Sequence, residues 1–186
     1  METLFSEPQE KRDGFAHDID RQNGKEEWLT PPCILQAFGP FDLDPCAPVK
    51  RPWPMAATHY TEQDNGLIKP WEGFVFCNPP YGSKTEDWLK RCAEHDNCLV
   101  LIFARTETNA FQKWVWPRAK SLFFIKGRLS FHHVDGKKGG AAGAPSVLVA
   151  YGDRADQMLR GNGKIPGWYV NNSWPDEFGP NGHTGL

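Results

Sequence analysis

The sequence lacks several features that would place it in a specialised class of protein. It has no apolar run of 18 residues, so we expect no membrane-spanning helix. Its first residues are polar and charged, which is unlike a signal peptide. The five cysteines are scattered, and no two of them form a Cys-x-x-Cys pair. We therefore expect reduced thiols, no disulfide framework, no metal site and a cytoplasmic location.

Basic residues are scarce in the first half of the chain and in excess in the second. Residues 1–98 contain 10 Lys and Arg against 17 Asp and Glu, whereas residues 99–186 contain 11 against 6. Between positions 113 and 138 there are seven basic residues and a single acid, Asp135. A face that binds a polyanion would give this asymmetry, and so would a solvated surface that happens to be basic.

The most informative stretch runs from Phe74 to Tyr81, with the sequence FVFCNPPY. Its apolar first half predicts a buried strand at 74–77. The strand must end at Pro79, because two successive prolines cannot donate to a ladder and leave a stiff, extended corner. Asn78 and the prolines offer carbonyl acceptors there, and Tyr81 offers an aromatic face. This corner suits the exocyclic amine of a base, and the alternative is a Pro-rich turn without such a role.

Strand and helix patterns alternate along the middle of the chain. The predicted helices cover 31–38 with Thr30 as N-cap, 84–97, and a segment from Thr106 or Thr108 to about Trp116. The predicted strands cover 41–47, 58–61, 74–77, 98–104, 122–125 and 145–151, and residues 135–145 are expected to form a Gly-rich loop. This order predicts an α/β fold with a mostly parallel sheet and an antiparallel C-terminal strand.

Two corners are expected at the carboxyl ends of strands, Asp44-Pro45 and Asn78-Pro79-Pro80-Tyr81. In open α/β sheets, ligands bind beyond these ends. The sequence therefore predicts that the two corners share one cleft.

In these motifs the chain resembles the phage-type DNA N6-adenine methyltransferases, which use S-adenosylmethionine. The resemblance covers roughly residues 26–151 and rests on motifs that follow in order along the chain. These are Trp28-Leu-Thr-Pro-Pro32, Phe41-Asp-Leu-Asp-Pro-Cys-Ala47, Asn78-Pro-Pro-Tyr81, Leu101-Ile-Phe-Ala-Arg-Thr106 and Lys126-Gly-Arg-Leu-Ser-Phe131. It implies a Rossmann-like S-adenosylmethionine-dependent methyltransferase fold, a flipped adenine in DNA as substrate, and a host-cytoplasmic location if the gene belongs to a phage.

The resemblance also implies a division of the chain and a set of site residues. Residues 1–25 would be a flexible arm, 26–152 the catalytic domain and 153–186 an irregular tail. The catalytic residues would be Asn78, Pro79, Pro80 and Tyr81. The cofactor would be held by Trp28, Thr30, Pro31, Asp44, Pro45, Ala47 and Asp64, and the DNA by Phe131, Arg128, Arg105, Lys137 and Lys138.

Several of these residues have a structural alternative. Asp44 before Pro45 also suits a turn, Asp64 in Asp-Asn-Gly also suits a plain turn, and Phe131 also suits a core. Trp28 is expected to pack more than to touch the cofactor, and the arginines also suit surface ion pairs.

The turn after Asp44 contains no glycine, unlike the broader methyltransferase pattern, so a non-catalytic nucleic-acid-binding module remains an alternative to an enzyme. Among enzymes, RNA adenine, cytosine N4 and a protein glutamine are alternative substrates for the same tetrapeptide. The basic stretch at 113–138 favours a nucleic acid over a protein side chain.

Overall fold

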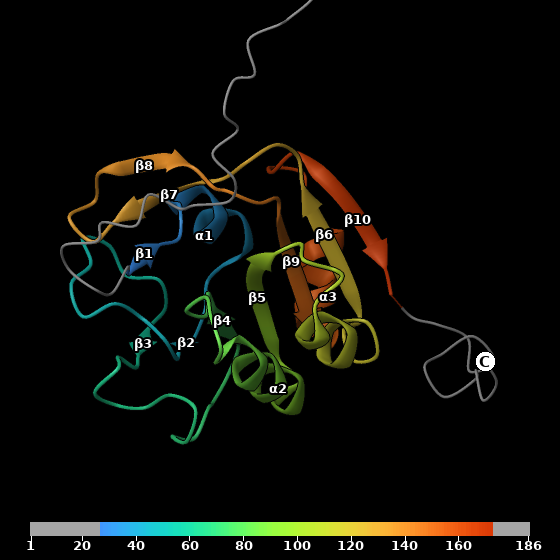
Figure 1. Cartoon of the computed structure of the whole chain (residues 1–186), viewed down its shortest axis with the longest axis horizontal. Coiled ribbons are helices and arrows are strands. Elements are labelled where there is room, and N and C mark those ends of the chain that lie inside the picture. Colours follow the sequence, from blue (N-terminus) through green and yellow to red (C-terminus); the bar gives the residue numbers. More distant parts are fainter. Residues whose placement is uncertain (1–26, 173–186) are drawn as a thin grey trace, which may run out of the picture.

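The computed structural model describes residues 27–172, and Figure 1 shows the whole chain. The predicted arm at 1–25 lies outside the described residues. The helices are α1 (Pro32–Phe38), α2 (Thr85–His95), the π-helix η1 (Phe111–Val115) and α3 (Asp153–Arg160). The strands are β1 (Trp28–Leu29), β2 (Leu43–Asp44), β3 (Thr58–His59), β4 (Val75–Cys77), β5 (Cys98–Phe103), β6 (Ser121–Ile125), β7 (Ser130–His133), β8 (Lys138–Ala141), β9 (Ser146–Tyr151) and β10 (Gly167–Asn171).

Most strands belong to one seven-stranded sheet with the order β10-β6-β9-β5-β4-β2-β3. A second sheet has the order β1-β7-β8 and lies across the upper edge of the main sheet in Figure 1. Because β2, β4, β5 and β6 run in one direction, their carboxyl ends all emerge at this upper edge.

The main sheet is mixed, and the prediction of a mostly parallel sheet is correct for only one half. The pairings β3-β2, β2-β4 and β4-β5 are parallel, whereas β5-β9, β9-β6 and β6-β10 are antiparallel. The difference arises because β9 enters between β5 and β6 and creates two antiparallel pairings at once. The α/β class is therefore confirmed, but with one antiparallel strand more than the sequence indicated.

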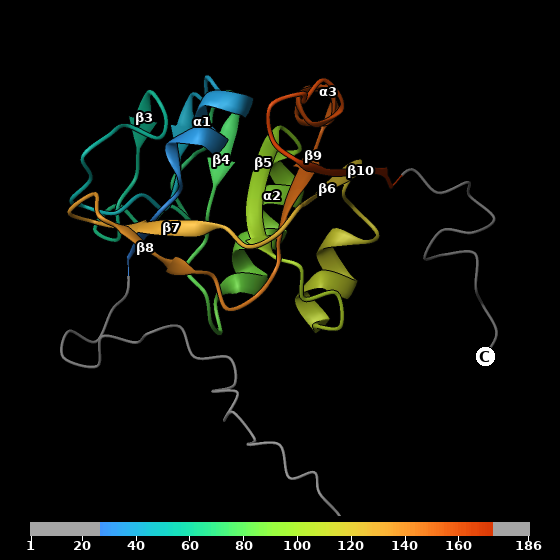
Figure 2. The same ribbon diagram turned by 90° about the horizontal axis from the view of Figure 1, so that it is seen from above.

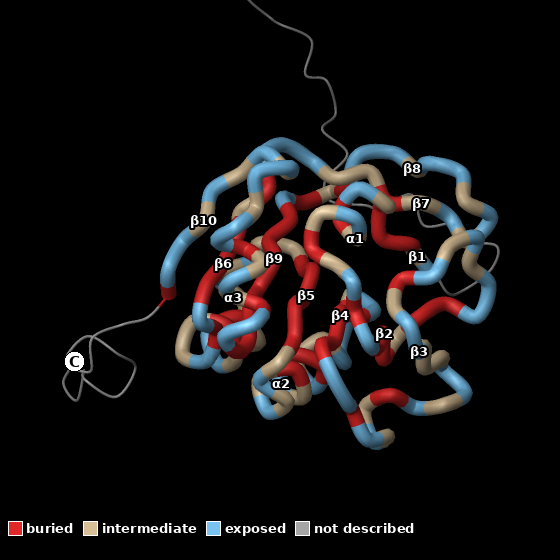
Figure 3. The backbone as a smooth tube through the Cα atoms, turned by 180° about the vertical axis from the view of Figure 1, so that it is seen from behind, coloured by how far each residue is buried: buried red, intermediate tan, exposed pale blue. Residues whose placement is uncertain are grey.

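Helices cover both faces of the main sheet, as the view from above in Figure 2 shows. Helix α2 and η1 lie on one face, where Trp88, Leu89 and Phe111 join a buried cluster with the strands. Helices α1 and α3 cover the other face through Ile34, Phe38 and Leu159. The burial-coloured trace in Figure 3 shows β5 and β9 as the buried centre and β10 as an exposed edge.

Most predicted elements are present with boundaries shifted by a few residues. The apolar run at 98–104 forms β5, which is buried at its first five positions, as expected for a strand covered on both faces. The predicted third helix is only the five-residue π-helix η1, and Thr108 Oγ1 accepts a hydrogen bond from the Phe111 amide at 3.4 Å. Part of the predicted loop at 135–145 pairs with β7 as β8.

The prediction of an irregular tail is wrong for residues 153–172. Helix α3 follows Gly152 directly, and β10 then pairs with β6 over five residue pairs. Residue 152 has a φ of +84°, and a side chain there would overlap the Asp96 carbonyl, so glycine is required at this turn. The rest of the predicted tail, 173–186, lies outside the described residues.

Candidate active site

Asn78 and its neighbours form the predicted corner at the carboxyl end of β4. The strand ends at Cys77, Pro79 is buried, and Pro80 is exposed with its carbonyl accepting a hydrogen bond from Thr85 Oγ1 at 3.2 Å. The amide oxygen of Asn78 is buried and has no hydrogen-bond partner among the described residues. A buried acceptor without a partner is costly in a folded protein, so this oxygen is suited to receive a donor from a ligand.

The second predicted corner lies directly beside the first. Strands β2 and β4 are parallel neighbours, with Leu43 opposite Val75, so Asp44 and Cys77 end at the same edge of the sheet. Cys46 connects the two corners. Its amide donates to Asp44 Oδ1 at 3.0 Å, and its thiol donates to the Asn78 carbonyl at 3.3 Å.

The thiol of Cys46 stays protonated and can act as this donor. Its sulfur lies 3.7 Å from that of Cys77, and the contact with Cys77 together with burial raises the pKa of Cys46 well above its usual value. The two corners are therefore held in a fixed relation by one side chain that the sequence analysis did not assign to the site.

Asp44 is a buried carboxyl group that forms no ion pair with a Lys or Arg of the described residues. It is 2% exposed, and burial raises its pKa from 3.8 to about 7, against the lowering effects of the Cys46 hydrogen bonds and the charge of Arg51. A carboxylate in this environment gains much from a cationic ligand, because the ligand would offset the cost of burying the charge.

The segment at 28–31 lies against this corner, but not in the predicted manner. Helix α1 begins at Pro32 with Pro31 as its N-cap, and no side chain caps it, so Thr30 is not the N-cap. Thr30 is fully buried, and its hydroxyl has no partner among the described residues. Leu29 packs with Ala47, so the segment that contains Thr30 lies against the chain that follows Asp44.

Trp28 packs within the small sheet. Its ring lies 4.5 Å from that of His133, and a side chain on Gly139 would overlap it at 2.6 Å. These contacts favour the packing role that the sequence already indicated for this residue.

Asp64 belongs to a tight turn that lies next to the Asp44 corner. Its Oδ2 accepts from the Thr61 amide at 2.9 Å, and its Oδ1 accepts from Lys69 Nζ at 2.6 Å. The Lys69 hydrogen bond is the main reason that the pKa of Asp64 is lowered to about 2. Both carboxylate oxygens are thus engaged within the protein, which favours the plain-turn alternative over contact with a cofactor.

The aromatic pair at the site is Tyr81 with Phe103, not Tyr81 with Phe131. The Tyr81 and Phe103 rings stack with centroids 4.2 Å apart and an angle of 11°, and Tyr81 is 39% exposed. Phe131 is 4% exposed and packs in the cluster that contains Phe38. Of the two alternatives left open for Phe131, the structure shows the core residue, because β7 lies against α1 and turns this ring inward.

The predicted DNA-contacting cations differ in how they are engaged. Lys137 pairs with Asp135 at 3.1 Å, and Arg105 lies 3.9 Å from Glu107. Lys138 is exposed and forms no ion pair with a described residue. Arg128 is also exposed, and its guanidinium donates to the Ala142 carbonyl at 3.4 Å.

The family model described as DNA N-6-adenine-methyltransferase (Dam) matches residues 19–158, which is more than half of the 186-residue chain. The chain belongs to the DNA N-6-adenine-methyltransferase family. It is therefore an enzyme that methylates N6 of adenine in DNA, and the family implies S-adenosylmethionine as methyl donor. Comparison with curated proteins and with solved structures gave no match.

The family assignment removes the non-catalytic alternative and the alternative substrates. It does not address a phage origin, which stays a prediction. No helix within residues 27–172 has the length and apolar character needed to cross a membrane. In the same part of the chain, no three His, Cys, Asp or Glu side chains are grouped so that they could hold a metal ion.

Two residues in contact with the predicted corners, Cys46 and Phe103, were not among the predicted site residues. Cys46 lies inside the first-strand motif, so the signal was its position between Asp44 and Pro48. Phe103 ends the most apolar strand of the chain, and only the stagger of β5 relative to β4 reveals that its ring reaches Tyr81.

Proposed function

We propose that this methyltransferase acts on an adenine flipped out of the duplex, at the corner formed by Asn78, Pro79, Pro80 and Tyr81. The observation that carries the proposal is the buried and unpartnered amide oxygen of Asn78. An adenine amine presents N–H donors in the plane of the base, and Asn78 Oδ1 with the Pro79 carbonyl would accept them. An amine inside a stacked duplex cannot reach this buried atom, so the base must leave the stack.

The acceptors contribute more than binding. As N6 gains a methyl group it also gains positive charge, and oxygens already fixed around it stabilise that charge without reorganising. Pro79 and Pro80 restrict the backbone at this point, so the carbonyls are held in position before the base arrives. Holding the amine in line with its reaction partner supplies a further part of the rate.

Tyr81 is the residue that would stack on the base. Its ring is held at a fixed tilt by Phe103 and is partly exposed beside Asn78. A stacking contact on an aromatic ring compensates for the contacts that the adenine loses when it leaves the duplex. Phe103 would act through Tyr81 by keeping its ring in place.

The residues beside Asn78 fit S-adenosylmethionine, which when bound supplies the methyl group on a positively charged sulfonium. The fit rests on the buried carboxyl group of Asp44 and on the buried hydroxyl of Thr30, which has no partner among the described residues. Asp44 would pair with a positive charge of the cofactor, and Thr30 would donate or accept a hydrogen bond. Pro31, Pro45 and Ala47 would line the same side, since all three are buried there.

Two further parts of the sequence-based interpretation continue as proposals. The half of the main sheet with β3, β2, β4 and β5 would be the Rossmann-like part. The predicted catalytic domain at 26–152 would be extended by α3 and β10 up to residue 172. The free cysteines among the described residues and the DNA substrate support a cytoplasmic location.

The decisive experiment is incubation of the protein with DNA and isotope-labelled S-adenosylmethionine, followed by mass spectrometry of the nucleosides. We expect labelled N6-methyladenine and no labelled N4-methylcytosine. Labelled methyl on cytosine alone would refute the adenine assignment. Asn78→Ala serves as the control for a contaminating enzyme, because this variant should give no labelled nucleoside.

A further inference from the structure

Trp168 is the most exposed large apolar side chain among the described residues. It is 77% exposed on β10, whereas Tyr169 beside it turns to the opposite face and donates to Asp156 at 2.7 Å. The backbone of β10 lies close against β6 at Gly167, where any side chain would overlap the Phe124 carbonyl. A single exposed ring is common on protein surfaces, so its significance depends on which groups surround it.

The ring has apolar neighbours on the same face of the sheet. Trp168 lies opposite Phe124 in the antiparallel register, and Val170, two residues on, is 39% exposed. Phe124 itself is only partly buried. Together these residues form an uncovered strip along the edge of the main sheet.

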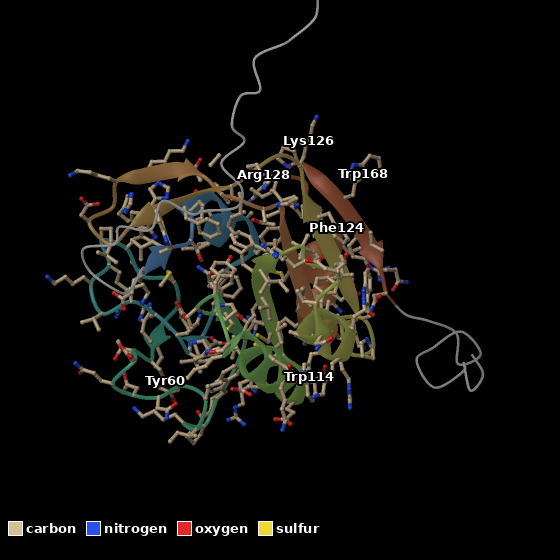
Figure 4. The ribbon with its side chains drawn as sticks, in the orientation of Figure 1. Tyr60, Trp114, Phe124, Lys126, Arg128 and Trp168 are labelled. Carbon is tan, nitrogen blue, oxygen red and sulfur yellow. The ribbon has the colours of Figure 1, made fainter. Side chains whose placement is uncertain are left out.

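Positive charge surrounds this strip. Lys126 follows Phe124 by two residues and so points to the same face, and its amide donates to the Pro166 carbonyl at 2.9 Å, which keeps it diagonal to Trp168. Lys164 and Arg128 are also exposed near this end of β6 and β10. Figure 4 shows Lys126, Arg128 and Trp168 at one end of the molecule and Tyr60 and Trp114 at the other.

These three cations differ from others in the same basic half of the chain. Lys126, Arg128 and Lys164 form no ion pair with a described residue, whereas Lys113, Lys120 and Lys137 pair with Glu86, Asp153 and Asp135. Among the described acids, Asp156 lies on the opposite face with Arg160 and Tyr169. The strip therefore combines an exposed ring with cations that pair with no acid within residues 27–172.

The strip also lies on the edge of the sheet that carries Asn78. Strands β4, β5 and β6 end at this edge, and β10 begins there because it runs antiparallel to β6. Four strand-to-strand steps separate β4 from β10 in the order β4-β5-β9-β6-β10. At about 4.8 Å for each step, the separation is roughly 19 Å, or five to six base pairs of B-form DNA.

We propose that the face of β6 and β10 with Trp168, Phe124 and Lys126 binds duplex DNA that flanks the target adenine. Lys126, with Arg128 and Lys164, contacts phosphates, and the ring of Trp168 packs against the sugar-phosphate backbone about five base pairs from the flipped base. The inference rests on the proposed function and adds to it a surface that binds the duplex next to the target adenine. A second copy of the chain suits this face less well, because a two-fold contact would bring the unpaired cations of both copies together.

The test measures affinity and methylation with duplexes that differ in flank length. One duplex carries ten base pairs on each side of the target adenine, and two others are shortened to three base pairs on one side or the other. The variants are Trp168→Ala and Lys126→Ala. The matched controls are Ile68→Ala, an equally exposed apolar residue at 76%, and Lys90→Ala on α2.

On the long duplex we expect Kd to rise about tenfold for Trp168→Ala, as for other aromatic contacts to nucleic acid. For Lys126→Ala we expect about a fivefold rise and a salt slope reduced by about 0.9, as for one lost phosphate contact. The kcat should stay unchanged in both variants, and both controls should behave as wild type. Shortening the flank that reaches the strip should raise the Kd of wild type by a similar factor. On that short duplex, wild type and both variants should have the same Kd.

Three results would overturn the inference, and they are distinguishable. If both variants bind the long duplex like an active wild type, the strip does not contact DNA. If sedimentation shows a wild-type dimer that Trp168→Ala dissociates, the strip is a self-association surface. If wild type forms no N6-methyladenine on any duplex, the proposed function itself fails. Thermal denaturation of Trp168→Ala checks its fold, and Lys126→Ala tests the same surface without altering β10.

Discussion

The two halves of the main sheet differ in the length of their strands and in how extensively the strands pair. In the parallel half, β3, β2 and β4 contain only two or three residues each, and β2 and β4 share a single residue pair. In the antiparallel half, β5 and β9 share six pairs and β6 and β10 share five. Strands β2 and β4 end at the Pro45 and Pro79 corners, so the side chains of Asp44 and Asn78 lie where the ladder stops.

This contrast indicates where each kind of substitution should act. The ends of the parallel strands carry Asp44 and Asn78, whose polar groups are buried at a cost to the free energy of folding. In the antiparallel half, β9 is buried at all six positions and β6 at four of five, and both are extensively paired. We therefore expect catalysis and stability to be separable between the two halves.

The strongest test of this division is Asn78→Ala in the parallel half. We expect kcat to fall at least 100- to 1000-fold, the effect of removing one preorganised polar contact to a charge that develops during the reaction. The affinity for S-adenosylmethionine should stay within a few fold, and the melting temperature should not fall, because an unpartnered buried oxygen is removed. Asn78→Asp keeps an acceptor oxygen and should retain more activity than the alanine variant. Full activity in Asn78→Ala would contradict the assignment of the site.

The matched test in the antiparallel half is Leu148→Ala in β9. Leu148 is fully buried, so its truncation should lower the free energy of unfolding by about 2–5 kcal/mol. The kcat per folded molecule should stay close to that of wild type. Chemical denaturation and active-site titration measure the two quantities. A large loss of kcat with intact stability would show that the halves are not separable.

The buried carboxyl of Asp44 predicts a dependence of stability on pH. Its pKa is about 7 in the folded protein and about 3.8 in an unfolded chain, so the folded state holds the extra proton between these values. The contribution of Asp44 to the stability of the cofactor-free protein should therefore be most favourable below about pH 4. It should fall as the pH rises to about 7 and stay level above that.

Between about pH 4 and pH 7, ionisation of Asp44 should lower the free energy of unfolding by at most about 4 kcal/mol, at 1.4 kcal/mol for each pH unit. Asp44→Asn should remove this fall, raise the melting temperature at pH 8 by up to about 10 °C, and weaken cofactor binding at least tenfold. Thermal denaturation at pH 5 and pH 8 provides the measurement. Equal pH dependence in both proteins would show that Asp44 is not buried as a neutral acid.

Base flipping can be tested through Tyr81. Tyr81→Ala should lose about 1–3 kcal/mol of stacking, which is up to about 100-fold in the initial methylation rate on a paired adenine. Part of this rate should return when the same adenine lies opposite a mismatch, because the mismatched base leaves the duplex more easily. Phe131→Leu is the control, since a core residue should affect both duplexes equally. Equal losses on both duplexes in Tyr81→Ala would argue against a stacking role.

The smallest expected effect distinguishes Lys138 from Lys137 on the small sheet. Lys138→Ala should weaken DNA binding about fivefold and reduce the salt slope by about 0.9. Lys137→Ala should have a smaller effect, because its ammonium already pairs with Asp135 at 3.1 Å. Fluorescence anisotropy at several salt concentrations compares the two. Equal slopes would mean that the ion pair opens when DNA binds.

The sequence predicts those parts of the fold that long local patterns determine. The apolar run of β5, the amphipathic α2 and the proline-terminated β4 were predicted because each carries its own pattern. Helix α3 and strand β10 were missed, since the surrounding Gly, Asn and Pro favour loops and only the pairing with β6 stabilises β10. The alternating directions of β5, β9, β6 and β10 also depend on which strands meet, which local patterns do not encode.

For the site, the sequence identified the two corners and the structure brought them together through β2 and β4. It could not decide between alternatives that depend on three-dimensional surroundings. Asp64 is engaged by Thr61 and Lys69 within its own turn, where the pattern alone does not show which way the carboxylate faces. Phe131 is buried by the packing of segments that are distant in the sequence. Thr30 was predicted to cap α1, but the helix begins one residue later, and the hydroxyl is left for another partner.

The close approach of Gly66 to Pro45 limits which positions near the Asp44 corner can be substituted. Any side chain at position 66 would overlap the Pro45 carbonyl and crowd Trp88, and the Gly66 carbonyl also accepts a hydrogen bond from Trp71 at 2.7 Å. The turn at 61–66 and the first-strand motif therefore form one rigid piece. Between them, the segment at 48–57 is held at both ends, and its Met55 packs with Leu29 and Ala47. We expect the exposed positions 49, 50, 52 and 54 to accept other side chains without moving Asp44, whereas position 66 must stay glycine.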